Sequence, residues 1–377
     1  MLTGAFGGFV LLSSPDGRRL AGRCWPILAL VALAFASTPS SFDPVQTLKK
    51  SFTLFCTVSF VLAIATKLSP MECIRLIVRV MVLECLLSLI WIVVFPDIGI
   101  QLRTGIGVRE DEIGEWWRGI FSHKQGLGVI AGLAIGLIAF YGRLVFSSVF
   151  VRIGAILLCL ACLAGARSAT GVLVAIVTVT AFYLFHWTAA RPARGTRSLL
   201  VNSFLAGGAV AYLAWSYGLL KFVPELLGRS SDLTGRDVYW TIAMDVFNSS
   251  GVTLLGGGYA VGLQAMFPEF VYVDNGYYDT LMQFGYLGSG IILVFVCWVL
   301  VSAKKLILRT PHELAVISIF PLTIALVLAV INVSEAVFLG SKNICTVFTV
   351  LAVAMLVQMK TRFGAGPGPK KRVAGWS

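Results

Sequence analysis

The sequence predicts an all-α protein that crosses a membrane many times. Hydrophobic residues make up 58% of its 377 residues and charged residues only 13%, whereas a soluble domain carries about 25% charged residues. The apolar residues also fall in runs close to the roughly 20 residues that a helix needs to cross the hydrocarbon layer. Length and composition therefore predict a single transmembrane domain, residues 1–377, built as a bundle of about ten or eleven helices.

The predicted spans follow one another along most of the chain. They fall near 20–37, 51–66, 74–95, 125–142, 147–165, 169–188, 199–220, 280–302, 313–332 and 343–359. A further apolar run at 1–14 is short for a span. The fourth run carries Gly128, Gly132 and Gly136. Because a spacing of four residues places these glycines along one helix face, close packing against a neighbouring helix is expected there.

The formal net charge of +12 reflects where the lysines and arginines lie, and does not indicate nucleic-acid binding. They gather in short connections that alternate with acidic or mixed ones, and again in the tail, 360–377. Basic connections stay on the cytoplasmic side of a membrane. The tail is therefore predicted to be cytoplasmic, and the loops near 96–124 and 221–279 to be extracytoplasmic.

The loop 221–279, inserted between two spans, is the longest interruption and carries much of the polar chemistry. Large apolar residues occur throughout it, so it is expected to be ordered. Apolar residues recur within it at helical spacing, at Tyr239, Ile242, Ala243, Val246 and Phe247. This pattern predicts an amphipathic helix that starts near Thr234 and lies on the bundle or in the headgroup layer.

Arginines are the first candidates for chemistry. Arg229 and Arg236 each follow a glycine. The planar guanidinium fork suits phosphate and diphosphate oxygens, and a preceding glycine lets a ligand approach the backbone. The alternative is a salt-bridge network with Asp232 and Asp237. Arg167 lies in a short connection between spans, where an ionisable group suggests function; the alternative is a side chain that reaches up to lipid phosphate.

His123 and Lys124 enter the fourth span from its predicted outer side. They add a titratable ring and a cation at the membrane face. The alternative is an interfacial anchor, in which Trp116 and Trp117 belong to the aromatic belt.

Asp274, Asn275 and Tyr277 lie where the chain re-enters apolar sequence. A carboxylate at the mouth of the bundle could take a proton from a hydroxyl group. The alternative is a helix cap, for which Asp and Asn are preferred, and both roles can hold together. Glu335, at the outer end of a later span, is a candidate ion-pair partner of an arginine, in a structural or a catalytic role.

A metal site is not expected. The eight cysteines lie in or beside apolar segments, which argues against a zinc site or a disulfide framework. The acidic cluster Glu110, Asp111 and Glu112 could hold a divalent ion, but a solvated run of charges is favoured.

Taken together, these stretches resemble the family of O-antigen ligases and exopolysaccharide polymerases. The similarity covers most of the chain and lies, in this order, in FSHKQGLG (121–128), GARSATG (165–171), GRSSDLTGRDVYW (228–240), DNGYYDTLMQFGYLG (274–288) and NVSEAVFLGSKN (332–343). The paired Gly-Arg motif with its following tryptophan is the most specific of these.

The resemblance implies a metal-independent and cofactor-independent glycosyltransferase of the bacterial inner membrane. Such enzymes use a polyprenyl-diphosphate-linked oligosaccharide as donor and act on the periplasmic, extracytoplasmic face. Arg167, Arg229 and Arg236 would then bind the diphosphate. The family carries a histidine, the proposed base, where this chain has Asp274. The catalytic base is therefore expected to be Asp274 or His123.

The remaining candidate substrate-binding residues are Lys124, Asn275, Tyr277 and Glu335. The expected function is polymerisation of glycan repeat units into surface polysaccharide. A ligase that attaches the glycan to a lipid acceptor is the alternative, and a transporter or flippase of lipid-linked sugar is the alternative from another class. The expected partners are the donor, a glycan acceptor, membrane lipid, and a chain-length regulator and flippase of the same pathway, with no nucleic acid. A transporter should show repeats and broken helices with polar groups at the membrane midplane, and neither is evident in the sequence.

Overall fold

The structure of the chain is a computed structural model. It describes residues 7–9, 11, 13–102, 115–189, 191, 195–203, 236–261, 275–311, 314–336, 339–340 and 343–364, with the backbone alone at 236–239, 334 and 362–364. Within these ranges the regular elements are helices, apart from one two-stranded antiparallel hairpin. The predicted all-α class is therefore confirmed.

Several helices are suited to crossing a membrane. In the described ranges, 8 helices are long and apolar enough to span, or 9 if a bent pair counts as one span. That pair is α2 (Pro15–Arg23) and α3 (Trp25–Ala36), which meet at 75°. The chain is thus a multi-pass membrane protein. The predicted run 199–220 lies mostly outside the described residues, so the total of about ten spans stays a prediction.

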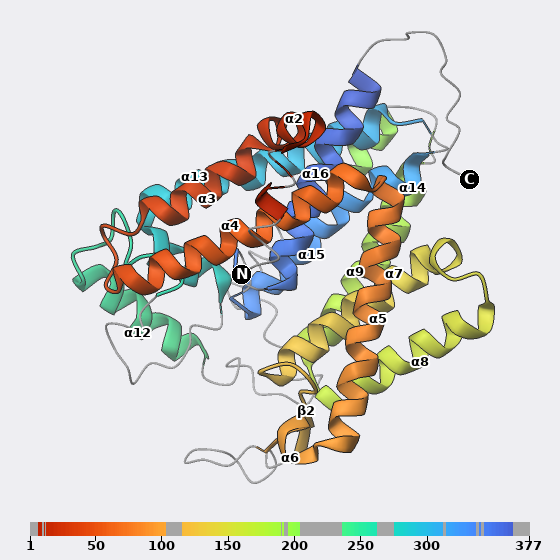
Figure 1. The fold of residues 1–377 in the computed structure, drawn as a ribbon, viewed down its shortest axis with the longest axis horizontal. Coiled ribbons are helices and arrows are strands. Elements are labelled where there is room, and N and C mark those ends of the chain that lie inside the picture. The colour runs from red at the N-terminus through yellow and green to blue at the C-terminus, as the bar shows by residue number, and fades with distance from the viewer. Residues whose placement is uncertain are drawn as a thin grey trace. The chain divides into compact units, whose positions relative to one another are not determined.

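The chain divides into two compact units, which we describe separately (Figure 1). The first unit comprises Met1–Lys67 and Trp187–Ala374. It contains α2, α3, α4 (Pro44–Lys67), α12 (Arg236–Ser249), α13 (Gly276–Arg309), α14 (Ala315–Ser318), α15 (Phe320–Ser334) and α16 (Ile344–Gly364). The second unit, Leu68–His186, contains α5 (Pro70–Val94), α6 (Pro96–Gly99), β1 (Ile100–Leu102), β2 (Glu115–Trp117), α7 (Lys124–Val145), α8 (Val149–Ala166) and most of α9 (Ala169–Ala189).

In the first unit, α16 packs against both α4 and α15. The C-terminal ends of α4 and α16 meet where the Gln358 side-chain amide donates a 2.5 Å hydrogen bond to the Ala65 carbonyl. Lys360 at the same end of α16 donates to the Ser302 hydroxyl of α13 at 3.0 Å. The C-terminal ends of α4, α13 and α16, each of which carries basic residues, therefore lie together.

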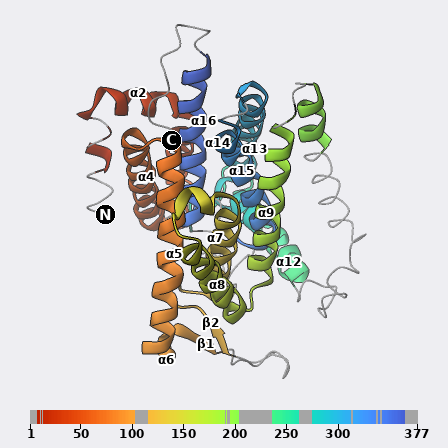
Figure 2. The ribbon, with the colours of Figure 1, turned by 90° about the vertical axis from the view of Figure 1, so that its right-hand side faces the viewer.

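In the second unit, α5, α7 and α8 pack against one another (Figure 2). The last carbonyls of α7 have no partner within their own helix. Arg75 of α5 donates to the Leu144 carbonyl at 2.9 Å, and Arg79 donates to the Val145 carbonyl at 3.2 Å. These arginines cap α7 and tie it to α5.

The glycines of α7 make the close contact that their spacing predicts. A side-chain carbon at Gly132 would overlap the carbonyl oxygen of Gly171 in α9. A side-chain carbon at Gly136 would lie 2.5 Å from the Cβ of Thr178, which is also in α9. The predicted close packing of α7 is confirmed, and its partner is α9.

Candidate functional site

The start of α13 is built around Asn275. Its side-chain oxygen accepts hydrogen bonds from the backbone N–H groups of Tyr277 at 2.9 Å and Tyr278 at 3.2 Å. Its amide donates to the Val333 carbonyl near the end of α15 at 3.2 Å. Asn275 is therefore the N-cap that was one of the two expected roles for this stretch, and it also joins two of the stretches on which the family resemblance depends.

Gly276 and Tyr277 extend this junction between α13 and α15. A side-chain carbon at Gly276 would overlap the amide of Asn332 and lie 3.0 Å from the backbone oxygen of Glu335. Glu335 is half-buried and is the C-cap residue of α15. The Tyr277 hydroxyl donates to the Ala329 carbonyl at 2.8 Å. The structure thus brings together three predicted binding residues, Asn275, Tyr277 and Glu335.

The amphipathic helix α12 packs against the first turns of α13. Ala243 and Phe247 are buried against Met282, and the Trp240 and Tyr278 rings are 5.7 Å apart. Ile242 was predicted on the same apolar face, but it is 37% exposed. Only part of the predicted apolar face, Ala243 and Phe247, is therefore buried against α13, and the place of Ile242 in the headgroup layer stays a prediction.

Arg236 is the first residue of α12, and its backbone lies one helical turn before Trp240. Its side chain lies outside what the structure describes. Arg229 and Asp274 also lie outside the described residues, as do the acidic cluster 110–112 and the tail beyond Gly364. The roles predicted for them stay predictions.

The helix α13 is broken near its start. Gly285 has φ 63° and ψ −171°, which interrupts the helical backbone. The freed groups pair with residues 252–258. Four hydrogen bonds close the break, namely Gly257 N to Met282 O (2.8 Å), Gly258 N to Gln283 O (3.1 Å), Tyr286 N to Thr253 O (2.9 Å) and Leu287 N to Leu254 O (3.1 Å). We call the paired segments 252–258 and 282–287 the glycine interlock. It satisfies backbone groups that would be costly to leave unpaired near a membrane.

Glycine is required on both sides of the interlock. Gly256 has φ 78° and Gly258 has φ 102°, values that side-chain-bearing residues rarely adopt. A side-chain carbon at Gly285 would overlap the carbonyl group of Leu254 and lie 2.6 Å from the backbone nitrogen of Gly256. The two segments therefore approach each other backbone to backbone.

A chain of hydrogen bonds leads from the interlock to a carboxylate. The backbone N–H of Ala260 donates to the Gln283 side-chain oxygen at 3.0 Å. The Gln283 amide nitrogen then donates to Oδ2 of Asp279 at 2.6 Å. Sequence reasoning missed Gln283. Its signal was the recurrence of Asn275, Asp279 and Gln283 every four residues, which forms a polar stripe on one face of α13.

Tyr259 connects this region to the rest of the first unit. It is 1% exposed, and its hydroxyl donates to the Leu339 carbonyl. Its backbone N–H donates to the Ser37 hydroxyl at 3.0 Å, and its carbonyl accepts from the Thr47 hydroxyl at 3.2 Å. Segments from three parts of the sequence therefore hold the stretch 252–261 in place.

In the second unit, His123 and Lys124 lie at the start of α7. His123 is the N-cap, and its Nδ1 accepts from the backbone N–H of Gln125 at 3.4 Å. A neutral ring that accepts at Nδ1 carries its proton on Nε2. The Lys124 ammonium lies 3.2 Å from the centroid of the Trp116 ring. This cation–π contact is compatible with the interfacial anchor raised as the alternative, and the binding role of Lys124 stays a prediction.

Arg167 lies at the same end of the second unit. It is exposed and ends α8 in the left-handed conformation, with φ 47° and ψ 42°. A side-chain carbon at Gly165 would overlap the ring of Trp117, and one at Gly128 would overlap the side chain of Ser168. The stretches 121–128 and 165–171 therefore meet in space. Left-handed backbone is costly for a residue with a side chain, and such residues cluster at functional sites.

No family model matches the chain, and no curated protein matches it. The part of the chain that the structure describes contains no group of three or more His, Cys, Asp and Glu residues able to hold a metal ion. The function has to be inferred from the residues and their arrangement.

Proposed function

We propose that the protein is a glycosyltransferase of the bacterial inner membrane that polymerises polyprenyl-diphosphate-linked glycan repeat units at the extracytoplasmic face. One observation carries this proposal. Stretches that are far apart in the sequence, and that carry the family resemblance, meet in space. Within the first unit, Asn275 donates to Val333, 58 residues away, and Trp240 lies beside Tyr278. In the second unit, Gly128 lies against Ser168.

The proposed reaction needs cations and a base. A hydroxyl of the acceptor glycan attacks the anomeric carbon of the donor sugar, the bond from that carbon to the diphosphate oxygen breaks, and polyprenyl diphosphate leaves. Cations placed where this negative charge develops usually make the largest single contribution to stabilising the transition state. In the proposal Arg229, Arg236 and Arg167 supply them, since the arginine fork binds phosphate oxygens in pairs. The acceptor proton passes to a base.

The base is proposed to be a carboxylate at the start of α13. Asp274 directly precedes the N-cap Asn275, and Asp279 follows in the first turns with one oxygen held by Gln283. A hydrogen bond of this kind orients a carboxylate. His123 is the other candidate, but its Nδ1 accepts a backbone N–H. With the ring proton on Nε2, His123 would have to give up this cap before it could accept a proton.

The break in α13 is the observation that favours a transporter, because broken helices form the binding sites of many transporters. Its position argues for the enzyme. Residues 286–309, which follow Gly285, would rise about 36 Å as a helix, and this is enough to cross the roughly 30 Å hydrocarbon core. The break therefore lies at one end of the span, whereas a transporter site is expected at the midplane.

The experiment that tests the function is a deletion of the gene with analysis of the cell-surface glycan. A polymerase deletion leaves glycan with single repeat units on its acceptor. A ligase deletion leaves long polymer that is unattached, and a flippase deletion leaves donor on the cytoplasmic side. Complementation with wild-type protein should restore long polymer, and Arg236→Lys should not, because lysine cannot make the paired contact. Full polymer length with Arg236→Ala would contradict the role of this arginine.

The proposed orientation has its own test. Ser249 ends α12, and Thr361 lies near the end of α16 where the basic residues gather; both are exposed. Ser249→Cys should react with a membrane-impermeant thiol reagent in intact cells, and Thr361→Cys should react only after lysis. The reverse pattern would place the start of α13 in the cytoplasm.

A further inference from the structure

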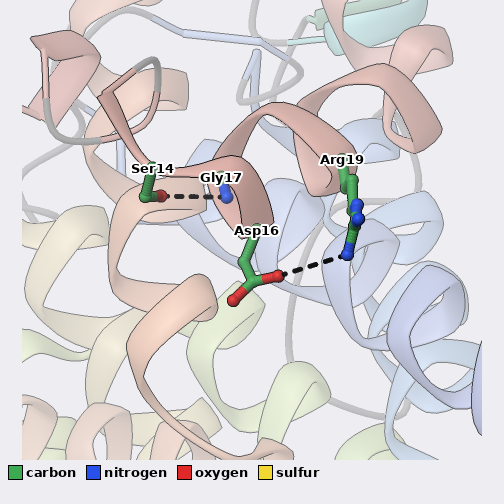
Figure 3. A network of polar contacts seen from close by, with 4 residues as sticks. All are labelled: Ser14, Asp16, Gly17 and Arg19. Carbon is green, nitrogen blue, oxygen red and sulfur yellow. Dashed lines mark hydrogen bonds and ion pairs between the residues drawn. The ribbon is translucent and has the colours of Figure 1, made fainter.

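The short helix α2 differs from every apolar span that surrounds it. It comprises nine residues, Pro15–Arg23. Ser14 is its N-cap, and the Ser14 hydroxyl accepts a hydrogen bond from the Gly17 N–H at 3.0 Å (Figure 3). The helix meets α3 at 75°. The residues of α3 are apolar throughout, so α3 belongs in the hydrocarbon layer. Because α2 departs from α3 at this large angle, α2 runs along the membrane surface instead of through the membrane.

The two faces of α2 have different surroundings. Gly17, Leu20 and Ala21 are buried, and α2 packs against α4 and α16. Figures 1 and 2 both show it beside the C-terminal half of α16. Its other face carries exposed arginines, among them Arg19 and Arg23. Charged side chains are costly in hydrocarbon, so this face has to lie in the headgroup layer or beyond it.

A tryptophan on the α3 side of the bend supports this depth. Trp25 is the first residue of α3, and it is 63% exposed. Exposed tryptophans of membrane proteins concentrate at the level of the headgroups, because the ring is apolar and the indole N–H is polar. Arg23 and Trp25 therefore place the bend at the membrane surface from two independent properties, charge and aromatic character.

We propose that α2 is a binding surface for anionic phospholipid, with Arg19 and Arg23 holding the headgroup phosphate. Charge complementarity identifies the occupant: basic segments next to a span attract anionic lipids, and the guanidinium fork matches phosphate. Arg19 also lies 3.8 Å from Asp16, with side chains 75% and 85% exposed (Figure 3). Such an exposed ion pair is weak, so a lipid phosphate can displace the Asp16 carboxylate. This role is independent of glycan transfer.

The test is native mass spectrometry of the full-length protein. The protein in detergent is titrated with phosphatidylglycerol or phosphatidylcholine, and the lipid that stays bound after release from the detergent is measured. Wild-type protein should retain phosphatidylglycerol in preference. Arg19→Gln/Arg23→Gln should weaken this retention about five-fold for each charge removed. Asp16→Asn should strengthen it, because the competing carboxylate is gone. The matched control is Lys49→Gln/Lys50→Gln, which removes two exposed charges from the first turns of α4 and should leave retention at α2 unchanged.

Three results would overturn the proposal. One is equal retention of phosphatidylglycerol by wild type and Arg19→Gln/Arg23→Gln. Another is an equal loss in the Lys49→Gln/Lys50→Gln control, which would indicate a general effect of net charge. The third concerns free anions. Inorganic phosphate at the same concentration should not compete, and competition by it would assign the site to free anions. Melting temperatures identify misfolded variants, and if the double variant does not fold, Arg19→Gln and Arg23→Gln are measured singly with the same criteria.

Discussion

The glycine interlock of the first unit and the α7–α9 contact of the second unit use the same residue for different purposes. Gly132 and Gly136 stay helical and let α9 approach, and Gly128 leaves room for Ser168 just before α9. Gly285 has positive φ, and the backbone on both sides of it is hydrogen-bonded to another segment. Glycine in α7 provides space, whereas glycine in α13 provides a backbone conformation. The second use also brings polar groups together, because Gln283 in the interlock donates a hydrogen bond to the Asp279 carboxylate.

The largest effect is expected at Gly285. Gly285→Ala would place a side chain on a backbone that costs about 1–3 kcal/mol for other residues, and the added carbon would overlap Leu254. Overpacking costs a further 1–3 kcal/mol or so. We expect little folded protein, measured as monodisperse yield and melting temperature in detergent.

Gly290→Ala is the matched control, because Gly290 lies in the same helix and a side-chain carbon added there would meet nothing within 4 Å. It should be neutral or stabilising by up to about 1 kcal/mol, as alanine is the better helix former. Equal melting temperatures for the two variants would show that the interlock does not contribute to stability.

A smaller effect is expected in α7. Gly132→Ala keeps a helical backbone but forces α9 away from the Gly171 carbonyl, which should cost about 1–3 kcal/mol. The control is Gly154→Ala in α8, where the added carbon meets nothing within 4 Å. The two substitutions should separate by a few degrees in melting temperature. If Gly132→Ala were as stable as Gly154→Ala, α7 and α9 could move apart at this contact without a loss of stability.

The smallest effect is expected at the helix cap beside the interlock. Asn275→Ala removes the bonds to Tyr277 and Tyr278 and the link to Val333. Loss of an N-cap costs about 0.5–2 kcal/mol. Asn248→Ala, at an exposed position of α12, is the control and should change stability by less than about 0.5 kcal/mol. If Asn275→Ala left the stability unchanged, Asn275 would not stabilise the start of α13 and would merely lie next to the carboxylates in the sequence.

The difference between the two glycine sites also explains what the sequence could predict. The contact of α7 follows from a spacing of four within one helix, so local periodicity was sufficient. The break in α13 depends on residues 252–258, which pair with it from outside the helix, and no local pattern reports such pairing. For the same reason Asn275 was predicted as a cap, because capping is local, but Gln283 was not, since its role depends on the backbone N–H of Ala260.

The helix bends show the same limit. The run 20–37 predicted one continuous span, and the structure divides it into the end of α2, a bend at Cys24, and α3. Hydropathy averaged over a window hides the change at Arg23, where the charged residues of α2 give way to the apolar residues of α3.

In the proposed function, the start of α13 holds the reacting groups of a glycan transfer. This role is tested most directly with purified protein in liposomes supplied with polyprenyl-diphosphate-linked repeat units and a chelator of divalent metals. Wild-type protein should release one polyprenyl diphosphate for each repeat unit added. Asp274→Asn should abolish release, because loss of a catalytic proton transfer lowers the rate by at least about a hundredfold. Asp279→Asn should reduce release by about a hundredfold if its carboxylate is the base. Asp245→Asn, an exposed change on α12, should have no effect. Donor that crosses the bilayer intact without diphosphate release, or full activity in both Asp274→Asn and Asp279→Asn, would contradict the account.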